Sequence, residues 1–260
     1  FRSAGRALEL ARRRKAGAVP FVLGLVALVP LARRQTYVWR DTESLFTHAL
    51  AVTERNYIAH TGLAAWQLEQ GEPAQAEENF RAALALYPLD ANALTGLGRI
   101  ALERGDLVAA EQHLERAKSI VASKWVRYHL GRLRLFQRAP ERALKEFRAA
   151  LELDPSLVDA HFNAGQILFN LGRKDEARAA FDAALRLAPA HAGALNGLGV
   201  LALDATDAPA AEDLFTRAIA TDPDYADAHN NLAVALERQG RRDEARTHRA
   251  EAQRLYGERP

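Results

Sequence analysis

Hydrophobic residues along most of the chain recur at spacings of three and four, the period that places side chains on one face of an α-helix. Short breaks that contain Gly or Pro separate these helical runs. No run alternates apolar and polar residues for long enough to indicate a strand. The pattern therefore predicts an all-α chain built from short helices.

The helical pattern is itself repeated, with starts separated by 33 or 34 residues. Its units begin at His60, Leu94, Arg127, His161, Leu195 and His229. In each unit the first run carries a Leu or Ala followed by a Gly or Ala, and the second run carries Ala residues around one bulky position. In the first five units that position is held by Phe80, Leu114, Phe147, Phe181 and Phe215. Because small residues let two helices approach closely, each unit is predicted to be a packed helix pair.

Gly and Pro stand where such a pair needs to turn. A helix favours a left-handed cap at its C-terminal end, and the positions between the two runs are held by Gly71, Gly105, Gly172 and Gly240. Near the first turn of the second helix, where a missing N–H costs no hydrogen bond, the chain has Pro73 and Pro140. The second helix is expected to end at Pro88, Pro155, Pro189 and Pro223.

The 34-residue period, with its Leu-Gly, Ala, Phe, Ala and Pro positions, resembles the tetratricopeptide repeat family over about residues 57–257. The resemblance implies an all-α, right-handed superhelical solenoid of six helix-turn-helix repeats. The second unit departs from the pattern, because it is one residue short and has Ala122 in place of the closing proline. The sixth carries Arg249 where the others have Phe or Leu, which fits a terminal unit with a solvated outer face.

The resemblance also implies a binding surface, the concave groove lined by the first helix of each unit, with a protein or an extended peptide as partner. The candidate partner-binding residues at the lining positions are Trp125, Tyr128, Arg132, Phe162, Asn163, Gln166, Asn196, Asn230 and Asn231. Asn amides both donate and accept hydrogen bonds, and relatives that grip a peptide backbone through a row of Asn match Asn163, Asn230 and Asn231. Glycine or His129 interrupts this row, so solvated surface Asn residues are the alternative. The Lys/Arg/Asn clamp of chaperone-binding relatives is absent.

Other functional chemistry finds little support in the sequence. Without Cys there is no disulfide, thiolate metal site or Cys nucleophile. The eight His residues show no metal-ligand spacing, and His60, His161 and His229 share one repeat position that is expected to pack against a neighbouring helix. No Gly-rich phosphate loop or Ser-His-Asp set is indicated. We therefore predict no catalytic residue, metal or cofactor, and do not expect this sequence to be an enzyme by itself.

Charge is distributed unevenly along the chain. Residues 1–40 hold nine Lys or Arg and one acid, a net charge of +8; since the whole chain carries +2, the remaining residues carry −6. A mildly acidic repeat region lacks the basic surface that binds a phosphate backbone. We therefore expect no nucleic-acid partner.

An apolar segment precedes the repeats. Residues 16–32 carry no charge, which is near the lower length limit of a membrane-spanning helix. We predict a basic cytoplasmic flank at residues 1–15 and a transmembrane helix at 16–34, with a signal sequence or a core helix as the alternatives. Six Lys or Arg precede the segment and three follow it, so the positive-inside rule puts the repeats on the extracytoplasmic side, in a bacterium the outer side of the inner membrane.

Residues 35–56 are predicted to form an interfacial linker and a half-repeat that caps the array. Asp41 suits a helix N-cap, and Phe46 and Ala49 reproduce the Phe and Ala offsets of a second repeat helix. The junction resembles membrane-spanning tetratricopeptide repeat proteins of the O-mannosyltransferase type at Gln35, Thr36, Trp39, Asp41, Leu45, Phe46 and Asn56. In that family a polyprenol-phosphate-sugar glycosyltransferase module of many spans precedes the repeats, and its catalytic acids lie in loops that this sequence does not contain.

These observations lead to three hypotheses on function. The first is a membrane-anchored scaffold that mediates protein–protein interaction through its concave surface. The second is the C-terminal, substrate-recruiting arm of a multi-span glycosyltransferase, and the third is a soluble periplasmic adaptor. The sequence begins at Phe1 and has no Met, so we expect a fragment or a processed form.

Overall fold

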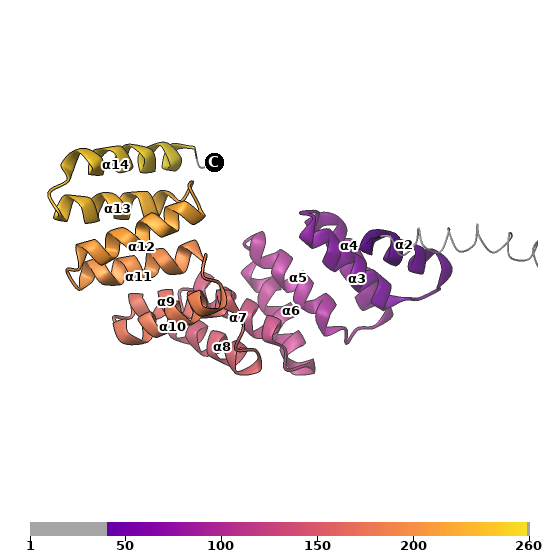
Figure 1. The fold of residues 1–260 in the computed structure, drawn as a ribbon. Helices are drawn as coiled ribbons and strands as arrows, with labels where there is room; N and C mark the ends of the chain where they lie inside the picture. The colour runs from indigo at the N-terminus through magenta and orange to yellow at the C-terminus, as the bar shows by residue number, and fades with distance from the viewer. Residues whose placement is uncertain (1–40, 259–260) are drawn as a thin grey trace, which may run out of the picture. The chain divides into compact units, whose positions relative to one another are not determined.

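The structure, a computed structural model, describes residues 41–258 of the chain. Within this range it contains thirteen α-helices and no strand, which confirms the predicted all-α class (Figure 1). The helices are α2 (Thr42–Val52), α3 (Tyr57–Glu69), α4 (Pro73–Leu86), α5 (Ala91–Glu103), α6 (Leu107–Ile120), α7 (Lys124–Phe136), α8 (Pro140–Leu153), α9 (Val158–Asn170), α10 (Lys174–Leu187), α11 (Ala192–Asp204), α12 (Ala208–Thr221), α13 (Ala226–Arg238) and α14 (Arg242–Gly257).

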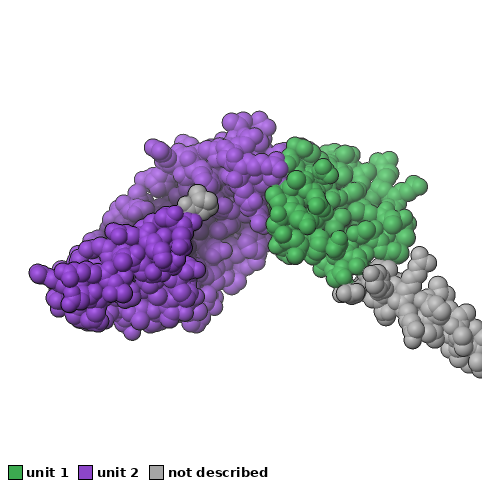
Figure 2. Space-filling view, turned by 90° about the horizontal axis from the view of Figure 1, so that it is seen from above, with its two compact units in different colours: residues 1–96 green, residues 97–260 purple. Residues whose placement is uncertain are grey.

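The chain divides into two compact units, residues 1–96 and 97–260, with the boundary inside α5 (Figure 2). In the first unit α2 packs against α3, and α3 against α4. In the second unit each helix from α6 to α14 packs against the next, and Figure 1 shows α11 to α14 side by side in chain order. The predicted helix pairs are therefore present as α3–α4, α7–α8, α9–α10, α11–α12 and α13–α14.

The predicted transmembrane helix, residues 16–34, lies outside the described residues, as do its basic flank and the start of the linker. Among the helices between residues 41 and 258, none combines the length and the hydropathy that crossing a bilayer requires. The membrane prediction therefore stays a prediction.

Capping residues set the starts of several helices. Asp41 is the N-cap of α2, as predicted, and its carboxylate accepts a hydrogen bond of 2.7 Å from the backbone N–H of Ser44. Pro73 and Pro140 occupy the first turns of α4 and α8, as predicted, where they remove no helical hydrogen bond.

The turn inside each helix pair uses one residue in the left-handed conformation. Values of φ between 73° and 80° occur at Gly71, Gly105, Gly172 and Gly240. The same repeat position is held by Arg138 and Thr206 in the third and fifth pairs, with φ of 55° and 63°. A side chain in this conformation costs roughly 1–2 kcal/mol. The packing of the two helices therefore outweighs the local preference at these two turns.

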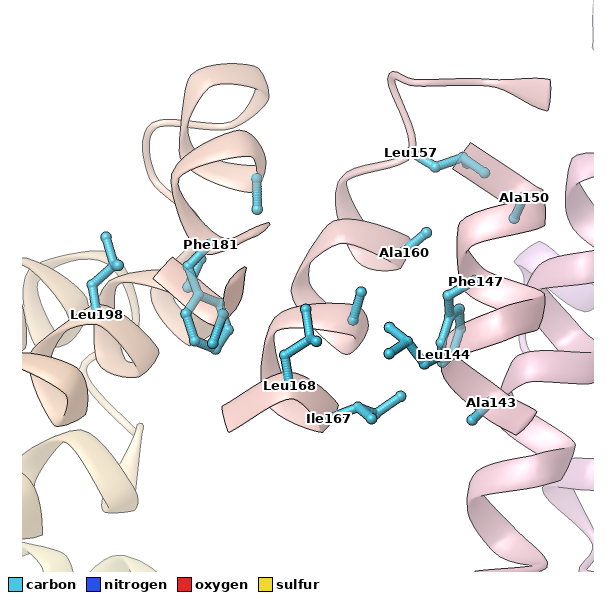
Figure 3. Close-up of a cluster of buried hydrophobic side chains, with 14 of the residues drawn as sticks. Ala143, Leu144, Phe147, Ala150, Leu157, Ala160, Ile167, Leu168, Phe181 and Leu198 are labelled. Carbon is cyan, nitrogen blue, oxygen red and sulfur yellow. The ribbon is translucent and has the colours of Figure 1, made fainter. Parts of the chain in front are cut away.

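A phenylalanine ring from most second helices fills the space beside a glycine of a first helix, and Leu114 of α6 does so beside Gly98. A Cβ atom added at Gly165 would lie 2.6 Å from the ring of Phe181, and one added at Gly197, in the next pair, would lie equally close. Figure 3 shows Phe181 between Leu168 and Leu198 in the core cluster of the second unit. Since Cβ atoms do not approach other atoms so closely, the two glycines leave the room that this buried ring occupies.

The same fit recurs in both units. The further pairs of ring and glycine are Phe147 with Gly131, Phe215 with Gly199, Phe80 with Gly96 and Phe46 with Gly62. The last pair joins α2 to α3, so the helix predicted to be a half-repeat contacts its neighbour as a second repeat helix does. At the other end, Arg249 of α14 is partly exposed and pairs with Glu237 at 2.5 Å, as expected of a solvated terminal helix.

Glu146 of α8 is a buried charge held by two cations. Arg127 of α7 lies 2.8 Å and Lys118 of α6 lies 3.3 Å from its carboxylate oxygens. Burial raises the pKa of Glu146, but the hydrogen bond from Arg127 and the charge of Lys118 outweigh burial, and the pKa falls below its usual value. The three charges therefore connect three successive helices of the second unit.

We expect Gly197→Ala to lower the free energy of unfolding by about 1–3 kcal/mol, the usual cost of overpacking a core. The cause is the contact between the added Cβ and the ring of Phe181. Urea-induced unfolding of the full chain, followed by circular dichroism, measures the change.

The matched control is Gly257→Ala at the end of α14, where an added Cβ meets nothing within 4 Å. This change is expected to leave stability unchanged or to raise it by up to about 1 kcal/mol, because Ala is the better helix former. Equal effects of the two substitutions would contradict the packing role of Gly197.

Candidate functional site

The first helices of successive pairs line one side of the second unit. α11 contacts both α9 and α13, and side chains of α7 and α9 share one hollow. We call this side the inner face and define it by Trp125, Tyr128, Arg132, Leu135, Phe136, Asn163, Gln166, Asn196, Val200, Asn230 and Asn231. Shared hollows and one hydrogen bond bring together five of the nine predicted partner-binding residues, Arg132, Asn163, Gln166, Asn196 and Asn231. Contact of the nine residues with a partner stays a prediction.

Two hollows lie along the inner face. The first, between α7 and α9, has a volume of about 360 Å³ and is lined by Arg132, Leu135, Phe136 and Asn163. The second, between α9 and α11, has a volume of about 240 Å³ and is lined by Gln166, Phe169, Asn170, Phe181, Asn196, Gly197 and Val200. The structure therefore brings Arg132 to Asn163, and Gln166 to Asn196.

The predicted Asn residues are partly engaged with the protein itself. The amide of Asn231 donates a hydrogen bond of 3.0 Å to the side-chain oxygen of Asn196, across α13 and α11. The amide of Asn163 donates one of 2.6 Å to the backbone oxygen of Asp159 in its own helix. Asn230 is half-buried on α13, at the repeat position that Asn196 holds in α11. The Asn196–Asn231 pair still has an amide N–H and a carbonyl oxygen to offer a ligand.

Phe162 is half-buried on α9, at the repeat position that Tyr128, Asn196 and Asn230 hold in the other first helices. Its ring packs against Phe181 and His191, at 6.2 and 4.8 Å between ring centroids. A Cβ added at Gly193 would lie 2.7 Å from the same ring. Phe162 therefore fills space between α9 and α11, and its contact with a partner stays a prediction.

Aromatic side chains cluster on α7. The rings of Trp125 and Tyr128 meet edge to face at 6.2 Å, and Tyr128 also packs against Phe147 at 5.7 Å. Burial and the charge of Asp159 raise the pKa of Tyr128, so its hydroxyl remains protonated at neutral pH. Trp125 stays half exposed beside this anchored tyrosine.

Sequence reasoning missed Leu135 and Phe136 at the end of α7. Both are exposed, and both line the hollow beside Arg132. Phe136 follows Trp125 by eleven residues, three helical turns, so the periodicity of α7 already placed the two rings on the same side. The lining positions of the family end one turn earlier, which is why they did not indicate Phe136.

His129 is a buried, neutral histidine under this surface. It is 9% exposed, and its Nδ1 atom has no hydrogen-bond partner among the described residues. Burial lowers the pKa of His129 to about 3, and the charges of Arg132 and Arg99 contribute in the same direction. Positive charge near the inner face therefore adds to burial in keeping His129 neutral.

The three His residues at one repeat position pack within their own repeats, as predicted. His229 donates from Nε2 to the backbone oxygen of Pro223 at 3.0 Å, and His161 does the same to Pro155 at 2.9 Å. His60 contacts the side chain of Asn79 at 2.9 Å. Between residues 41 and 258 no group of three or more His, Asp or Glu side chains is arranged to hold a metal ion.

Known proteins identify the repeat. A family model described as tetratricopeptide repeat matches residues 61–123, 128–192 and 196–260, more than half of the chain. A search of curated proteins found no match to this sequence.

Solved structures share the fold. YrrB, described as a TPR protein with an unusual peptide-binding site, is 27% identical with a TM-score of 0.54, over 70% of this chain and 95% of its own. The Pseudomonas aeruginosa pilF structure is 19% identical with a TM-score of 0.70, over 78% and 93%. PilW, described as a widely conserved type IV pilus biogenesis factor, is 20% identical with a TM-score of 0.68, over 80% and 96%. At their identities, the last two show a likeness of fold alone.

We expect His129 to make the protein less stable as the pH falls. Below pH 6.5 an unfolded histidine takes up a proton, whereas folded His129 stays neutral down to about pH 3. The stability that depends on its neutral form is thus fully present above pH 6.5 and is lost between these two values. His129→Leu removes the effect, so from pH 7.5 to 4.5 the variant gains about 2–3 kcal/mol relative to the wild type.

Urea-induced unfolding of both proteins at the two pH values measures this difference, in which the other titrating groups cancel. If the difference in unfolding free energy between wild type and variant is the same at both pH values, His129 takes up its proton in the folded state.

Proposed function

Because the chain belongs to the tetratricopeptide repeat family, we propose that it is a protein-interaction scaffold whose inner face holds an extended segment of a partner protein. Repeats of this kind bury their core between neighbouring helices and leave one continuous side of the stack free for binding. The proposal includes the nine predicted partner-binding residues and adds Leu135 and Phe136.

One observation carries the proposal: two hollows adjoin α9, and each combines amide side chains with apolar groups. The first offers a cation, an amide and exposed apolar groups, in Arg132, Asn163 and Phe136. The second offers the amides of Gln166 and Asn196 above the ring of Phe181. An extended chain presents alternating backbone amides and side chains, so amides and apolar hollows in succession suit it.

The printed description of YrrB supports the same class of ligand. That structure is described by its peptide-binding site, and it matches 70% of this chain at 27% identity. A peptide is therefore the first ligand to test on the inner face.

A photo-crosslinking amino acid at Gln166, exposed on α9, is expected to capture partner protein in the native host. The matched control is the same amino acid at Arg178, exposed on the second helix α10 of that pair. Adducts from position 166 and none from position 178 support the inner face as the binding side. Adducts from position 178 alone would move the binding surface to the second helices.

We further propose that the scaffold is anchored in a membrane. In this organisation residues 1–15 are a cytoplasmic flank, 16–34 a transmembrane helix, 35–56 a linker with a capping half-repeat, and 57–257 the repeats outside the cytoplasm. The uncharged run and its basic flanks support the span. The contact between Phe46 and Gly62 supports a half-repeat next to it, because it reproduces the contact between successive repeats.

The junction residues favour a second candidate, the substrate-recruiting arm of a multi-span glycosyltransferase. Its support is the resemblance of residues 35–56 to O-mannosyltransferase-like proteins. In that arrangement the inner face presents acceptor proteins to an active site on another part of the protein. The gene sequence upstream of Phe1 separates the two candidates, since only the arm requires a series of further spans there.

Alkaline phosphatase fused after Pro260 tests the anchoring in a bacterial host. We expect the fusion to be active, because this enzyme folds only outside the cytoplasm, and to sediment with the membranes. Deletion of residues 16–34 should leave it inactive and soluble. A fusion protein that is active but soluble would favour a periplasmic adaptor. One that is inactive and bound to the membrane would place the repeats on the cytoplasmic side.

A further inference from the structure

Four side chains form a row along α7, here named the α7 stripe: Trp125, Tyr128, Arg132 and Phe136. Their spacing of three and four residues places them on one side of the helix. Eleven residues of helix separate the first from the last, which corresponds to about 16 Å. Trp125 and Phe136, at the two ends, are 49% and 54% exposed. An exposed Trp beside a half-buried Tyr and a half-buried Arg has the composition of an interface hot spot.

Arg132 differs from the other arginines of α7 in its charge partner. Arg127 pairs with Glu146 at 2.8 Å, and Arg134 pairs with Glu111 at 2.6 Å. Among the described residues no ion pair includes Arg132, although its side chain is half-buried in the wall of the first hollow. A cation that has lost part of its hydration gains most from a negatively charged ligand.

The charges around Arg132 leave its positive field uncompensated. Burial is the main cause of the lowered pKa of His129, and the charges of Arg132 and Arg99 lower it further. Arg99 is already paired with Glu103 at 2.9 Å. Asp159 of α9 raises the pKa of Tyr128, whereas the charge of Arg132 lowers it, and no ion pair joins Asp159 to Arg132 among the described residues. Arg132 is therefore the cation at this place that remains to meet a ligand.

We propose that the α7 stripe binds a segment of the partner protein in which an acidic side chain lies between two apolar ones. The carboxylate pairs with Arg132, and the apolar side chains cover Trp125 and Phe136. Asn163, across the same hollow, offers its amide to the backbone of the segment. The inference rests on the proposed function, because it specifies the partner of the same inner face.

The length of the stripe sets the spacing of the partner's residues. Trp125 and Arg132 are about 10 Å apart along the helix axis, and Arg132 and Phe136 about 6 Å. An extended chain advances about 3.3 Å per residue and turns successive side chains to opposite faces, so side chains on one face lie an even number of positions apart. The first apolar side chain therefore lies four positions before the acid and the second lies two positions after it, and the long side chains of Trp125 and Arg132 span the difference in length.

The acidic group is a side chain inside the segment. A C-terminal carboxylate bound at Arg132 would end the chain there and leave either Trp125 or Phe136 uncovered. A single unpaired arginine is also too little charge for a polyanion, whose binding requires several cations in a row.

The probe is a fluorescent peptide of the sequence Ser-Phe-Ser-Ser-Ser-Glu-Ser-Leu-Ser with both ends blocked, and a second with the order reversed. Binding to the full chain in detergent is followed by fluorescence polarisation. We expect one of the two orders to bind about tenfold more tightly than its counterpart with Gln in place of Glu, because the carboxylate makes a charge-assisted hydrogen bond. This preference should weaken as salt is added.

Arg132→Gln is expected to abolish the preference for Glu and to leave binding of the Gln peptide unchanged. The matched control is Lys145→Gln, which removes one positive charge from an exposed position of α8 and should preserve the preference. Trp125→Ala and Phe136→Ala should each weaken the binding of the Glu peptide and of the Gln peptide by a similar factor. Thermal unfolding of Arg132→Gln checks that the fold is retained.

The inference is overturned if Arg132→Gln keeps the preference for Glu, or if neither order of the Glu peptide binds. A Gln peptide with a free C-terminus gives a further test. If it binds tightly to the wild type and not to Arg132→Gln, the ligand of Arg132 is a terminal carboxylate and the inference is overturned. Arg132-dependent binding to phosphatidylglycerol vesicles in place of the peptide would assign the stripe to a lipid surface. Photo-crosslinking at position 166 does not depend on Arg132. Adducts at position 166 together with no preference for the Glu peptide would therefore overturn this inference alone. Adducts from position 178 alone would overturn the proposed function.

Discussion

The ring of Phe181 fits into the space left by Gly165 in its own helix pair and by Gly197 in the next, and contacts of this kind set how closely successive pairs approach. A bulky side chain at Gly165 would push α9 away from α10, which carries Phe181, and one at Gly197 would push α11 away from it. Gly197 also lines the second hollow, so the side chain that it lacks leaves space on the inner face. Arg132, Gln166 and Val200 share another repeat position of the first helices, and all three line the hollows.

Binding on such a surface depends on how α7 differs from its neighbours. Its inner side carries Trp, Tyr and Arg, whereas α9 and α11 offer mainly amides. An amide row suits a peptide backbone of any sequence, whereas a cation between two exposed rings selects particular side chains. The inner face thus combines general contacts on two helices with a selective contact on one. An anchor at residues 16–34 would hold this surface near a membrane and raise the effective concentration of partners there.

Much of the fold follows from local signals, and the sequence contains them in every unit. Asp41 caps a helix because its carboxylate reaches a backbone N–H three residues away. The four turn glycines adopt the left-handed conformation that they tolerate best. Part of the site followed from repeat position, because the shared hollows bring Arg132 to Asn163 and Gln166 to Asn196. The packing of Phe162 against His191 and Gly193 did not follow from the sequence, because both lie about 30 residues away.

The sequence by itself determined the period, the helix pairs, the caps and the residue types that each helix could present, since these depend on interactions within about one turn or on a repeated pattern. The tertiary structure decided which of those groups remain available to a ligand. It paired Asn196 with Asn231, gave Arg127 and Arg134 acidic partners, and left Arg132 without one among the described residues. It also made Arg138 and Thr206 accept a turn that suits glycine. Each of these outcomes is set by contacts between helices, whose energies exceed the local preferences of single residues.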